Sequence, residues 1–184
     1  MSPERLWLLS IALNERGHRR LAIWVKRLNA LLYNNSLPPG ATVSPDIRFE
    51  HRGFGTIIHD RVVIGRRVTI GHHVTLAVRD KPGVRTNIVL EDDVEVGPSA
   101  VVITARGESI VIGTGARVGA GAVVTEDVPP GATVFSAPSR VLTERAPIRL
   151  ARLDGVRDPA AARLGEIDPP ERAHKAAGDD HVDV

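Results

Sequence analysis

Residues 58–75 read IHDRVVIGRRVTIGHHVT, which is three successive blocks of six residues with one shared pattern. Each block begins with isoleucine and has valine in fifth place, and two of the three have glycine in second place. An α-helix repeats its apolar positions about every 3.6 residues and a simple strand every second residue, and neither period fits this stretch. A six-residue repeat with an inward aliphatic side chain is typical of short strands joined by tight corners. Three such strands close one coil of a triangular β-solenoid.

The same block recurs on both sides of this stretch. LPPGAT and VSPDIR precede it over residues 37–48, and the pattern returns after interruptions at residues 77–83 and 103–111. The later blocks are VRTNIV, LEDDVE and VGPSAV, followed by IGTGAR, VGAGAV and VTEDVP. We expect a tight corner in second place to favour a residue without Cβ. The glycines found there are Gly65, Gly71, Gly97, Gly113 and Gly119. The sequence therefore predicts an all-β solenoid over residues 37–142, with about 18 residues in each coil.

The composition agrees with a narrow and uniform core. Aromatic residues make up 3% of the 184 residues and hydrophobic residues 42%, so aliphatic side chains must fill the interior. The net charge of +2, without a basic stripe interleaved with aromatic residues, argues against nucleic acid as a partner. The chain has no cysteine, which excludes a disulfide, a thiolate metal site and a cysteine nucleophile.

Residues 1–36 precede the repeat and are expected to form two helices. Ser2 and Pro3 are an N-cap and a first-turn proline, and Gly17 ends the first helix. The second helix covers about residues 18–33. Its apolar side is Leu21, Val25, Leu28 and Leu32, and its basic residues are Arg19, Arg20, Lys26 and Arg27. We expect this hairpin to pack on its own domain or on a partner subunit, and contact with a membrane surface is the weaker alternative.

Two further expectations concern the ends of the chain. Residues 143–184 abandon the repeat and are rich in charge, proline and alanine, so most of this tail is expected to be disordered. The apolar run at residues 6–13 is too short to span a bilayer. It also lacks a small-residue cleavage site, so no signal peptide is expected. The absence of cysteine fits the expected cytoplasmic location.

An irregular stretch, DIRFEHRGFGTIIHD at residues 46–60, interrupts the repeat near its start. The repeat, together with VGAGAVVTEDVPPGATVFSAPSRVL at residues 118–142, resembles the left-handed β-helix acyltransferases. LPPGATVSPDIRFEH followed by GTIIHDRVVIGRRVTIGHHVTL is similar to the serine acetyltransferase group, shorter relatives of which acetylate sugars on polysaccharides. The resemblance covers residues 33–142. It implies a left-handed coil, a homotrimer, and acyl-CoA bound in a groove between neighbouring β-helices.

Glu50 and His51 occupy the places of an acidic residue and a histidine that end a block just before a short glycine-containing crossover in this family. The resemblance implies that His51 is the general base. It would take the proton of an acceptor hydroxyl as that oxygen attacks the thioester carbonyl of acetyl-CoA. Backbone N–H groups would stabilise the oxyanion, and the absence of cysteine favours direct transfer in a ternary complex. The alternative is a loop histidine without a role.

The resemblance also implies residues that bind the acyl donor. Ala77, Pro98 and Ala120 stand where the family places small residues and backbone along the pantetheine arm. Arg140 stands where a basic residue meets the CoA phosphates. Plain corner geometry explains the three small residues equally well.

Arg85, Asn87 and His73 are the candidates for binding the acceptor, and the sequence departs here from the family pattern. Thr86 and Asn87 align with the family's arginine and histidine near the serine carboxylate. Arg85 takes the arginine place only after a shift of one residue. Ser36 aligns with the aspartate that partners the histidine. The reaction is therefore indicated more clearly than the acceptor.

Other functions stay open from the sequence. The weakened carboxylate clamp and the short basic N-terminal segment favour, as the alternative to serine or a related small acceptor, O-acetylation of a sugar or polysaccharide intermediate. His59, His72 and His73 could instead bind the zinc ion of a hydratase, although their places do not match the ligands of the related γ-class carbonic anhydrases, and no metal is expected. A non-catalytic trimeric scaffold is the remaining alternative.

The family also bears on partners. Its long helical domain builds a dimer of trimers, and because that domain is reduced here to about 36 residues, a simple trimer is expected. Family tails bind cysteine synthase through an acidic end. GDDHVDV at residues 178–184 has a faint similarity to such an end, and a solvated terminus without a partner is the simpler interpretation.

Overall fold

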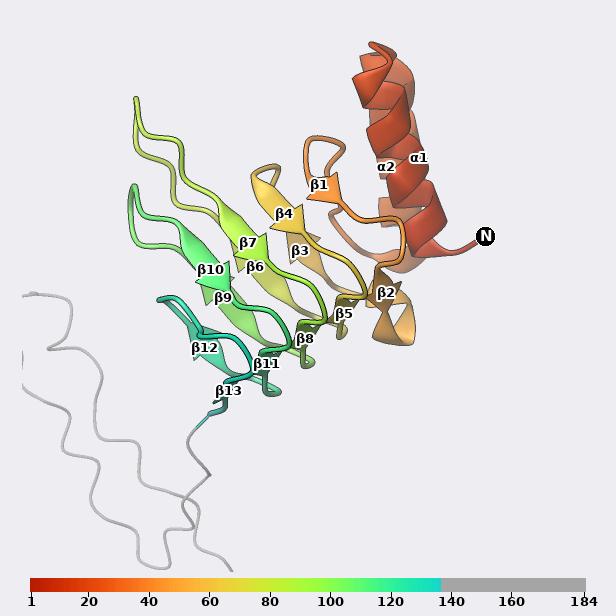
Figure 1. The fold of residues 1–184 in the computed structure, drawn as a ribbon. Helices are drawn as coiled ribbons and strands as arrows, with labels where there is room; N and C mark the ends of the chain where they lie inside the picture. Colours follow the sequence, from red (N-terminus) through yellow and green to blue (C-terminus); the bar gives the residue numbers. More distant parts are fainter. Residues whose placement is uncertain (137–184) are drawn as a thin grey trace, which may run out of the picture. The chain divides into compact units, whose positions relative to one another are not determined.

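The computed structural model describes residues 1–136, as two helices followed by a stack of short strands (Figure 1). The helices are α1 (Pro3–Glu15) and α2 (Arg19–Tyr33). The expectations for the tail at residues 143–184, for the end of the repeat at residues 137–142 and for Arg140 lie outside the described residues. The domain boundaries after residues 36 and 142 stay predictions.

From β1 to β12 each strand pairs in parallel with strands three places away in the chain, and β13 pairs with β11, so the strands form three ladders. Face 1 contains β1 (Thr42–Val43), β4 (Val62–Ile64), β7 (Ile88–Leu90) and β10 (Ile110–Ile112). Face 2 contains β2 (Arg48–Phe49), β5 (Thr69–Ile70), β8 (Glu95–Val96), β11 (Arg117–Val118) and β13 (Thr133–Val134). Face 3 contains β3 (Ile57–Ile58), β6 (Thr75–Ala77), β9 (Val101–Ile103) and β12 (Val123–Val124). These ladders confirm the predicted β-solenoid. The bends are named below after the faces they join: corner 1–2, corner 2–3 and corner 3–1.

The core is a column of aliphatic side chains from the first and fifth residues of the blocks. In residues 58–75 all of these positions are buried: Ile58, Val62, Ile64, Val68, Ile70 and Val74. Two aromatic side chains, Trp7 and Phe49, also belong to the core cluster of the described residues, and their ring centroids lie 5.8 Å apart. Both lie at the N-terminal end of the column, so the coils that follow keep the aliphatic interior that the composition predicted.

One predicted block does not join the core at its first residue. Val84, which begins VRTNIV, is exposed and pairs through an antiparallel bridge with Lys81. The chain is still in the loop that follows β6 at this point, and the buried positions return at Ile88. The first interruption of the repeat is therefore longer than the sequence pattern indicated.

The glycines in second place are explained by the approach of the next coil. A Cβ on Gly71 would lie 2.6 Å from the backbone nitrogen of Pro98, and one on Gly97 would lie 2.7 Å from that of Ala120. Neither glycine is among the residues with positive φ. The left-handed conformation comes two places later, at Arg67, His73, Asp93 and Ser99 among others. The expectation that second place forms the tight corner is wrong: the fourth residue turns the chain, and second place must be small because the coils stack so closely.

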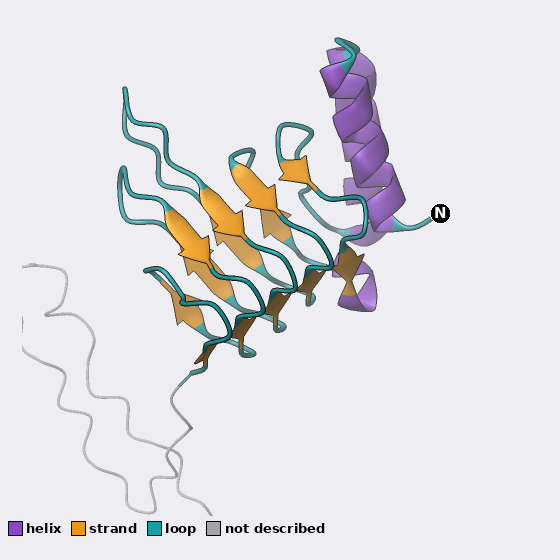
Figure 2. Cartoon of the chain, in the orientation of Figure 1, coloured by secondary structure: helices purple, strands orange, loops and turns teal. Residues whose placement is uncertain are grey.

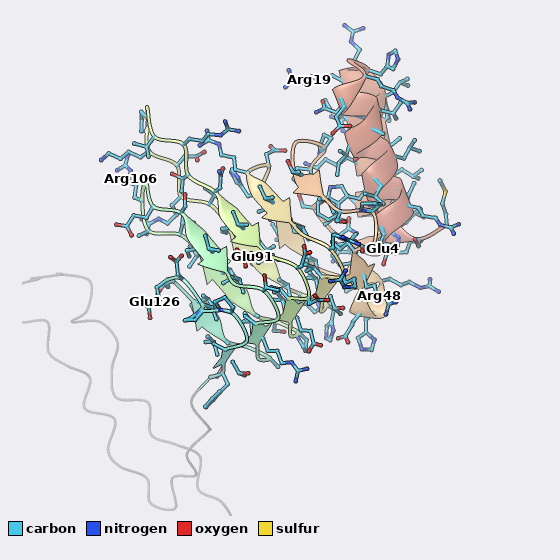
Figure 3. All side chains as sticks on the ribbon, in the orientation of Figure 1. Glu4, Arg19, Arg48, Glu91, Arg106 and Glu126 are labelled. Carbon is cyan, nitrogen blue, oxygen red and sulfur yellow. The ribbon has the colours of Figure 1, made fainter. Side chains whose placement is uncertain are left out.

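Helix α1 closes the N-terminal end of the solenoid. The Ser2 hydroxyl accepts from the Arg5 N–H at 3.5 Å, as expected of an N-cap. Trp7 is fully buried, and its indole N–H donates to the Pro38 carbonyl at 2.7 Å. Glu4 reaches the first strand of face 2, where its carboxylate accepts from the Phe49 N–H at 3.1 Å (Figure 3). The predicted helices are confirmed, and this end of the hairpin packs on its own domain.

The apolar side of α2 does not take part in that packing. Of the residues of α2, Ala22 and Asn29 are buried, and the Asn29 amide donates to the Pro3 carbonyl at 3.0 Å. Exposed apolar side chains lie elsewhere on the helix: Leu21, Trp24, Leu28, Leu31 and Leu32. Contact of this side with a partner subunit or a membrane surface stays a prediction. Within residues 1–136 no helix combines the length and the apolar character that a membrane crossing requires.

Candidate functional site

His51 lies in a strained insertion at corner 2–3. The 3₁₀ turn η1 (Glu50–Gly53) follows β2, and within it His51, Arg52 and Gly53 have φ values of +47°, +59° and +58°. Non-glycine residues in this region cost on the order of 1–3 kcal/mol each and occur most often at functional sites. The turn is tied down on its far side, where the Gly55 N–H donates to the Asn34 carbonyl at 3.1 Å. The irregular stretch of the sequence is therefore a defined bend that presents His51 at an edge of the solenoid.

The corner residues of successive coils form a column along this edge. The paired strand residues of face 2 are Phe49, Ile70, Val96 and Val118. The residues two places after them are His51, His72, Pro98 and Ala120. Pro98 and Ala120 take the place of His72 in the next two coils, since the Ser99 N–H donates to the His72 carbonyl and the Gly121 N–H to the Pro98 carbonyl. His51 belongs to the inserted turn at the same edge, and Phe54, whose carbonyl accepts from the His73 N–H, takes the place of His72 in the first coil. Two of the residues predicted to bind the acyl donor, Pro98 and Ala120, therefore lie on the same edge as the predicted base.

Three imidazole rings gather at the first two levels of this edge. The ring centroids of His51 and His72 are 4.9 Å apart with the planes at 84°, and those of His72 and His73 are 5.4 Å apart. His73 also lies edge to face with Phe54, at 5.6 Å, and against Gly55, where a Cβ would come 2.1 Å from its Nδ1. The Nδ1 atom of His72 is buried and has no hydrogen-bond partner within the described residues. The predicted acceptor residue His73 thus shares the corner with His51, and the ring that touches His51 is His72.

Glu50 occupies a different place from His51 although the two are adjacent in sequence. It lines a hollow of about 660 Å³ on face 2, together with Arg48, Glu95 and Arg117 among others. An ion pair joins Arg117 Nε to Glu95 Oε2 at 3.3 Å in this hollow. A role for Glu50 in the reaction stays a prediction.

Arg85 and Asn87 lie at another corner of the chain. Both belong to the segment between β6 on face 3 and β7 on face 1, whereas His51 lies between faces 2 and 3. They line a groove of about 1000 Å³ at corner 3–1, where the Arg61–Asp80 ion pair of 2.9 Å is also found. The loops at this corner extend outward (Figure 2), and Arg106 lies on the loop between β9 and β10 (Figure 3). Within one chain the structure does not bring the predicted acceptor residues Arg85 and Asn87 to His51.

The remaining sequence candidates divide between the corners. Ala77 ends β6, at the far end of face 3 from the corner 2–3 column. His59 lies between β3 and β4 at corner 3–1, where its Nδ1 accepts from the Arg61 N–H at 3.2 Å. One chain therefore does not assemble His59 with His72 and His73, and no group of three potential metal-binding side chains occurs in residues 1–136.

Ser36, which aligns with the aspartate partner in the family, is part of a backbone pairing. It bridges to Ile57, with its N–H donating to the Thr56 carbonyl at 2.9 Å and its carbonyl accepting from the Ile58 N–H at 3.0 Å. Its short side chain shows no hydrogen bond to His51 among those of the described residues. The contact between His51 and His72 was not anticipated from sequence. The signal that could have revealed it is the pairing of VSPDIRF with IGRRVTI across one coil.

The clear electrostatic perturbations lie at corner 1–2, away from this edge. The Arg67 guanidinium donates two hydrogen bonds of 2.6 Å to the Asp93 carboxylate, and they hold the pKa of Asp93 below its usual value and that of Arg67 above its own. A hydrogen bond from the Ser44 hydroxyl at 2.7 Å lowers the pKa of Asp46. The Arg67–Asp93 pair links two coils, whereas the Ser44–Asp46 pair lies within one corner.

The chain is similar to known acyltransferases, among them serine acetyltransferases and, over 85 residues at 36% identity, a 2,3,4,5-tetrahydropyridine-2,6-dicarboxylate N-acetyltransferase of Staphylococcus aureus. No protein-family model matches the chain. The serine acetyltransferase of Bacillus licheniformis is 30% identical over 161 residues, which cover 85% of this chain and 71% of that protein. The serine acetyltransferase of Bacillus subtilis is 32% identical over 133 residues, and the match spans 59% of it.

Solved structures give the same result. The soybean serine acetyltransferase apoenzyme has a TM-score of 0.64 at 33% identity, covering 74% of this chain and 55% of that one. The Neisseria gonorrhoeae serine acetyltransferase in complex with serine has a TM-score of 0.64 at 27% identity, covering 76% and 55%. The chain thus spans little more than half the length of these solved relatives. The solenoid of six-residue blocks, the histidine in its inserted turn and these similarities lead to one conclusion: the chain belongs to the serine acetyltransferase family of acyltransferases.

Proposed function

We propose that the protein is an acetyl-CoA-dependent O-acetyltransferase in which His51 is the general base. The observation that carries the proposal is the column at corner 2–3, where His51 lies on one edge with the small residues Pro98 and Ala120. Small side chains leave the backbone of this edge open to an extended arm, and the imidazole lies at its upper end. A base beside an open edge supports a transfer from a thioester to a hydroxyl.

In the proposed reaction a ring nitrogen of His51 takes the proton of the acceptor hydroxyl as that oxygen bonds to the thioester carbonyl carbon. The carbon–sulfur bond then breaks, and the imidazolium returns its proton to the leaving sulfur. Histidine suits both steps because its unperturbed pKa lies near neutrality. The chain has no cysteine, so no thiol of the protein competes as an acyl carrier.

Serine or a related small hydroxyl compound is the acceptor that the relatives support. One of the solved relatives is a complex with serine. In this chain the carboxylate of such an acceptor would need Arg85 from a neighbouring copy, because Arg85 and His51 lie at different corners. The same separation favours the second candidate, a sugar or polysaccharide hydroxyl, which needs no carboxylate clamp.

A homotrimer would supply that neighbour, and the outward side chains of the three faces support it. Face 1 carries the paired valines Val63, Val89 and Val111. Face 3 carries Ile57, Thr75, Val101 and Val123, of which Ile57 and Val123 are more than half exposed in the single chain. Face 2 carries Arg48, Thr69, Glu95, Arg117 and Thr133. A three-fold ring needs two different contact surfaces on each subunit, and the two aliphatic faces meet this need while the polar face meets water.

The test is an acceptor panel with the full chain. CoA release from acetyl-CoA is followed with a thiol reagent, which has no background from a protein without cysteine. The acceptors are L-serine, L-homoserine, an amino sugar and an oligosaccharide, and His51→Asn is run beside each. Turnover with serine or homoserine that depends on His51 supports the first acceptor class. Turnover with the sugars alone supports the second. If none of these acceptors causes release of CoA, the proposed function is contradicted and the non-catalytic scaffold is favoured.

A further inference from the structure

We propose that His72 is the positioning residue of His51, with the buried Nδ1 of His72 accepting a hydrogen bond from the His51 N–H that takes no part in proton transfer. The inference rests on the proposed function, because His51 needs such a partner only as a base. In this proposal His72 replaces the aspartate partner of the family, whose place in this chain is taken by Ser36.

The first support is that the two rings are in contact. Phe49 pairs with Ile70, so the inserted turn that carries His51 and the corner that carries His72 follow paired strands at the same edge. The ring centroids are 4.9 Å apart and the planes nearly perpendicular, so the rim of one ring meets the other. No hydrogen bond joins the rings among those of residues 1–136. Catalytic hydrogen bonds are often long or poorly aligned without substrate, and His51 is exposed and has room to turn.

The second support is the unpaired nitrogen. Nδ1 of His72 is buried, and it lacks a partner within the described residues. A buried polar atom without a partner is costly, and such atoms are few in native proteins and call for an explanation. The His51 N–H, once that ring turns toward the coil below, is a donor that provides that explanation.

The third support is that the backbone around His72 is held between two coils. The His72 carbonyl accepts from the Ser99 N–H at 2.9 Å, and the next residue, His73, donates its N–H to the Phe54 carbonyl at 2.8 Å. Bonds to the coils on either side therefore hold the backbone that carries the His72 ring. A fixed acceptor selects which ring nitrogen of its neighbour keeps the proton, and this leaves the other nitrogen unprotonated for the acceptor hydroxyl.

The other charged and titratable groups around this edge do not take the role. Glu50 and Arg52 are exposed on the same turn as His51, and Glu50 lines the hollow on face 2. Glu4, from α1, is bonded to the Phe49 N–H. His73 lies between His72 and Phe54. Among these side chains, His72 is the one in ring contact with His51.

The experiment replaces the acceptor nitrogen in the full chain. His72→Phe keeps a planar ring and removes Nδ1. His72→Asn keeps an acceptor, because its Oδ1 is bonded to Cγ as Nδ1 is in histidine. We expect His72→Phe to lower kcat by about 10- to 100-fold, the rate equivalent of one hydrogen bond to a charged group, with little change in the acceptor KM. We expect His72→Asn to recover most of the loss. His18→Phe, an exposed histidine with no side-chain cap bond, is the matched control.

The pH profile separates positioning from mere packing. Without the acceptor nitrogen the imidazolium form of His51 is less stable, so the acid limb of kcat/KM moves to lower pH in His72→Phe. The proposal is overturned if the acid limb stays in place. It is also overturned if the limb moves to higher pH, which is the effect expected from removing a positive charge at His72. So does equal activity of His72→Phe and the wild type.

A measurement without turnover keeps this inference distinct from the proposed function. Imidazole ¹⁵N spectra of the full chain, assigned with His51→Asn, report which nitrogen of His51 carries the proton. A single tautomer in the wild type that becomes a mixture in His72→Phe supports the hydrogen bond. A mixture in both overturns it. Should no acceptor be acetylated, the proposed function fails while the spectra still decide whether the two rings are coupled.

Discussion

His51 and His72 lie ring to ring, with centroids 4.9 Å apart and planes at 84°, although they belong to different coils. The parallel pairing of Phe49 with Ile70 places both at the same edge. The predicted base therefore has a neighbour that follows from how the coils stack. The same stacking places Pro98 and Ala120 on this edge in the next two coils, which is why this corner is the candidate site.

Replacement of His51 tests the base directly. His51→Asn is preferable to alanine because asparagine tolerates the left-handed backbone that His51 adopts. We expect acetyl transfer to fall by about 10²- to 10⁴-fold, the usual contribution of a general base, at unchanged thermal stability. Steady-state kinetics and a thermal melt are the measurements. Full activity in a folded variant would show that the crossover histidine has no role.

Gly55 holds the position of His73, and alanine there should displace that ring. The added Cβ would meet His73 Nδ1 at 2.1 Å, in a residue whose φ is +70°. Gly115→Ala is the control, because its φ is +66° and nothing lies within 4 Å of the added atom. We expect Gly115→Ala to cost about 1–2 kcal/mol from its backbone alone. Gly55→Ala should cost more and also raise the acceptor KM. Equal losses in urea unfolding would contradict the contact.

Gly97 tests the explanation of the glycines by coil stacking. Its added Cβ would lie 2.7 Å from the Ala120 nitrogen, a backbone atom that cannot turn aside. We expect Gly97→Ala to lower the free energy of unfolding by about 1–3 kcal/mol or more, as overpacking does. Gly119→Ala is the matched variant, with 3.2 Å to the Val134 carbonyl oxygen in the last described coil. The order of the two losses in denaturant melts is the result to check, and a larger loss at Gly119 would count against the explanation.

Val89 tests the proposed trimer. Its side chain is half-buried on the outward side of face 1, between Val63 and Val111. We expect Val89→Lys to dissociate the assembly, because a buried ammonium without a partner is costly at an apolar contact. Thr69→Lys, on the polar face 2, should leave it intact. Sedimentation velocity distinguishes these outcomes. A wild-type monomer, or a trimer that survives Val89→Lys, would exclude face 1 as the contact.

The ion pair of Arg67 and Asp93 predicts a pH-dependent stability. The folded-state pKa of Asp93 is lowered, chiefly by the hydrogen bonds from Arg67. Its contribution to stability is therefore fully present above the unfolded value near pH 3.9 and is lost as the pH falls through the folded value. Asp93→Asn should be less stable than the wild type at pH 7, and the difference should shrink below about pH 4. Both exposed groups are screened by salt, so the difference should also shrink in concentrated NaCl.

Urea unfolding at pH 7, 5 and 3 measures this effect. Glu126→Gln serves as the control, since Glu126 is exposed and has no ion pair among those of residues 1–136 (Figure 3). A constant difference between Asp93→Asn and the wild type across these pH values would show that the pair does not couple protonation to folding.

The six-residue pattern by itself determined the fold and most of the core. Ile58, Val62 and their counterparts were identified as inward-facing because the repeat is local, and each short strand needs one buried aliphatic at a fixed place. The same regularity made the interruption around His51 visible. Sequence reasoning went wrong at Gly71 and at Val84, because the distance between coils and the length of a loop are not encoded in a six-residue pattern.

Only the tertiary structure decided which residues meet. It joined His51 to His72, left His59, Arg85 and Asn87 at another corner, and left the apolar side of α2 exposed. These outcomes depend on the register between coils, and insertions of different length shift that register at each turn. A local pattern specifies which side of a strand faces inward, whereas the stacking of whole coils determines which corner residues are neighbours.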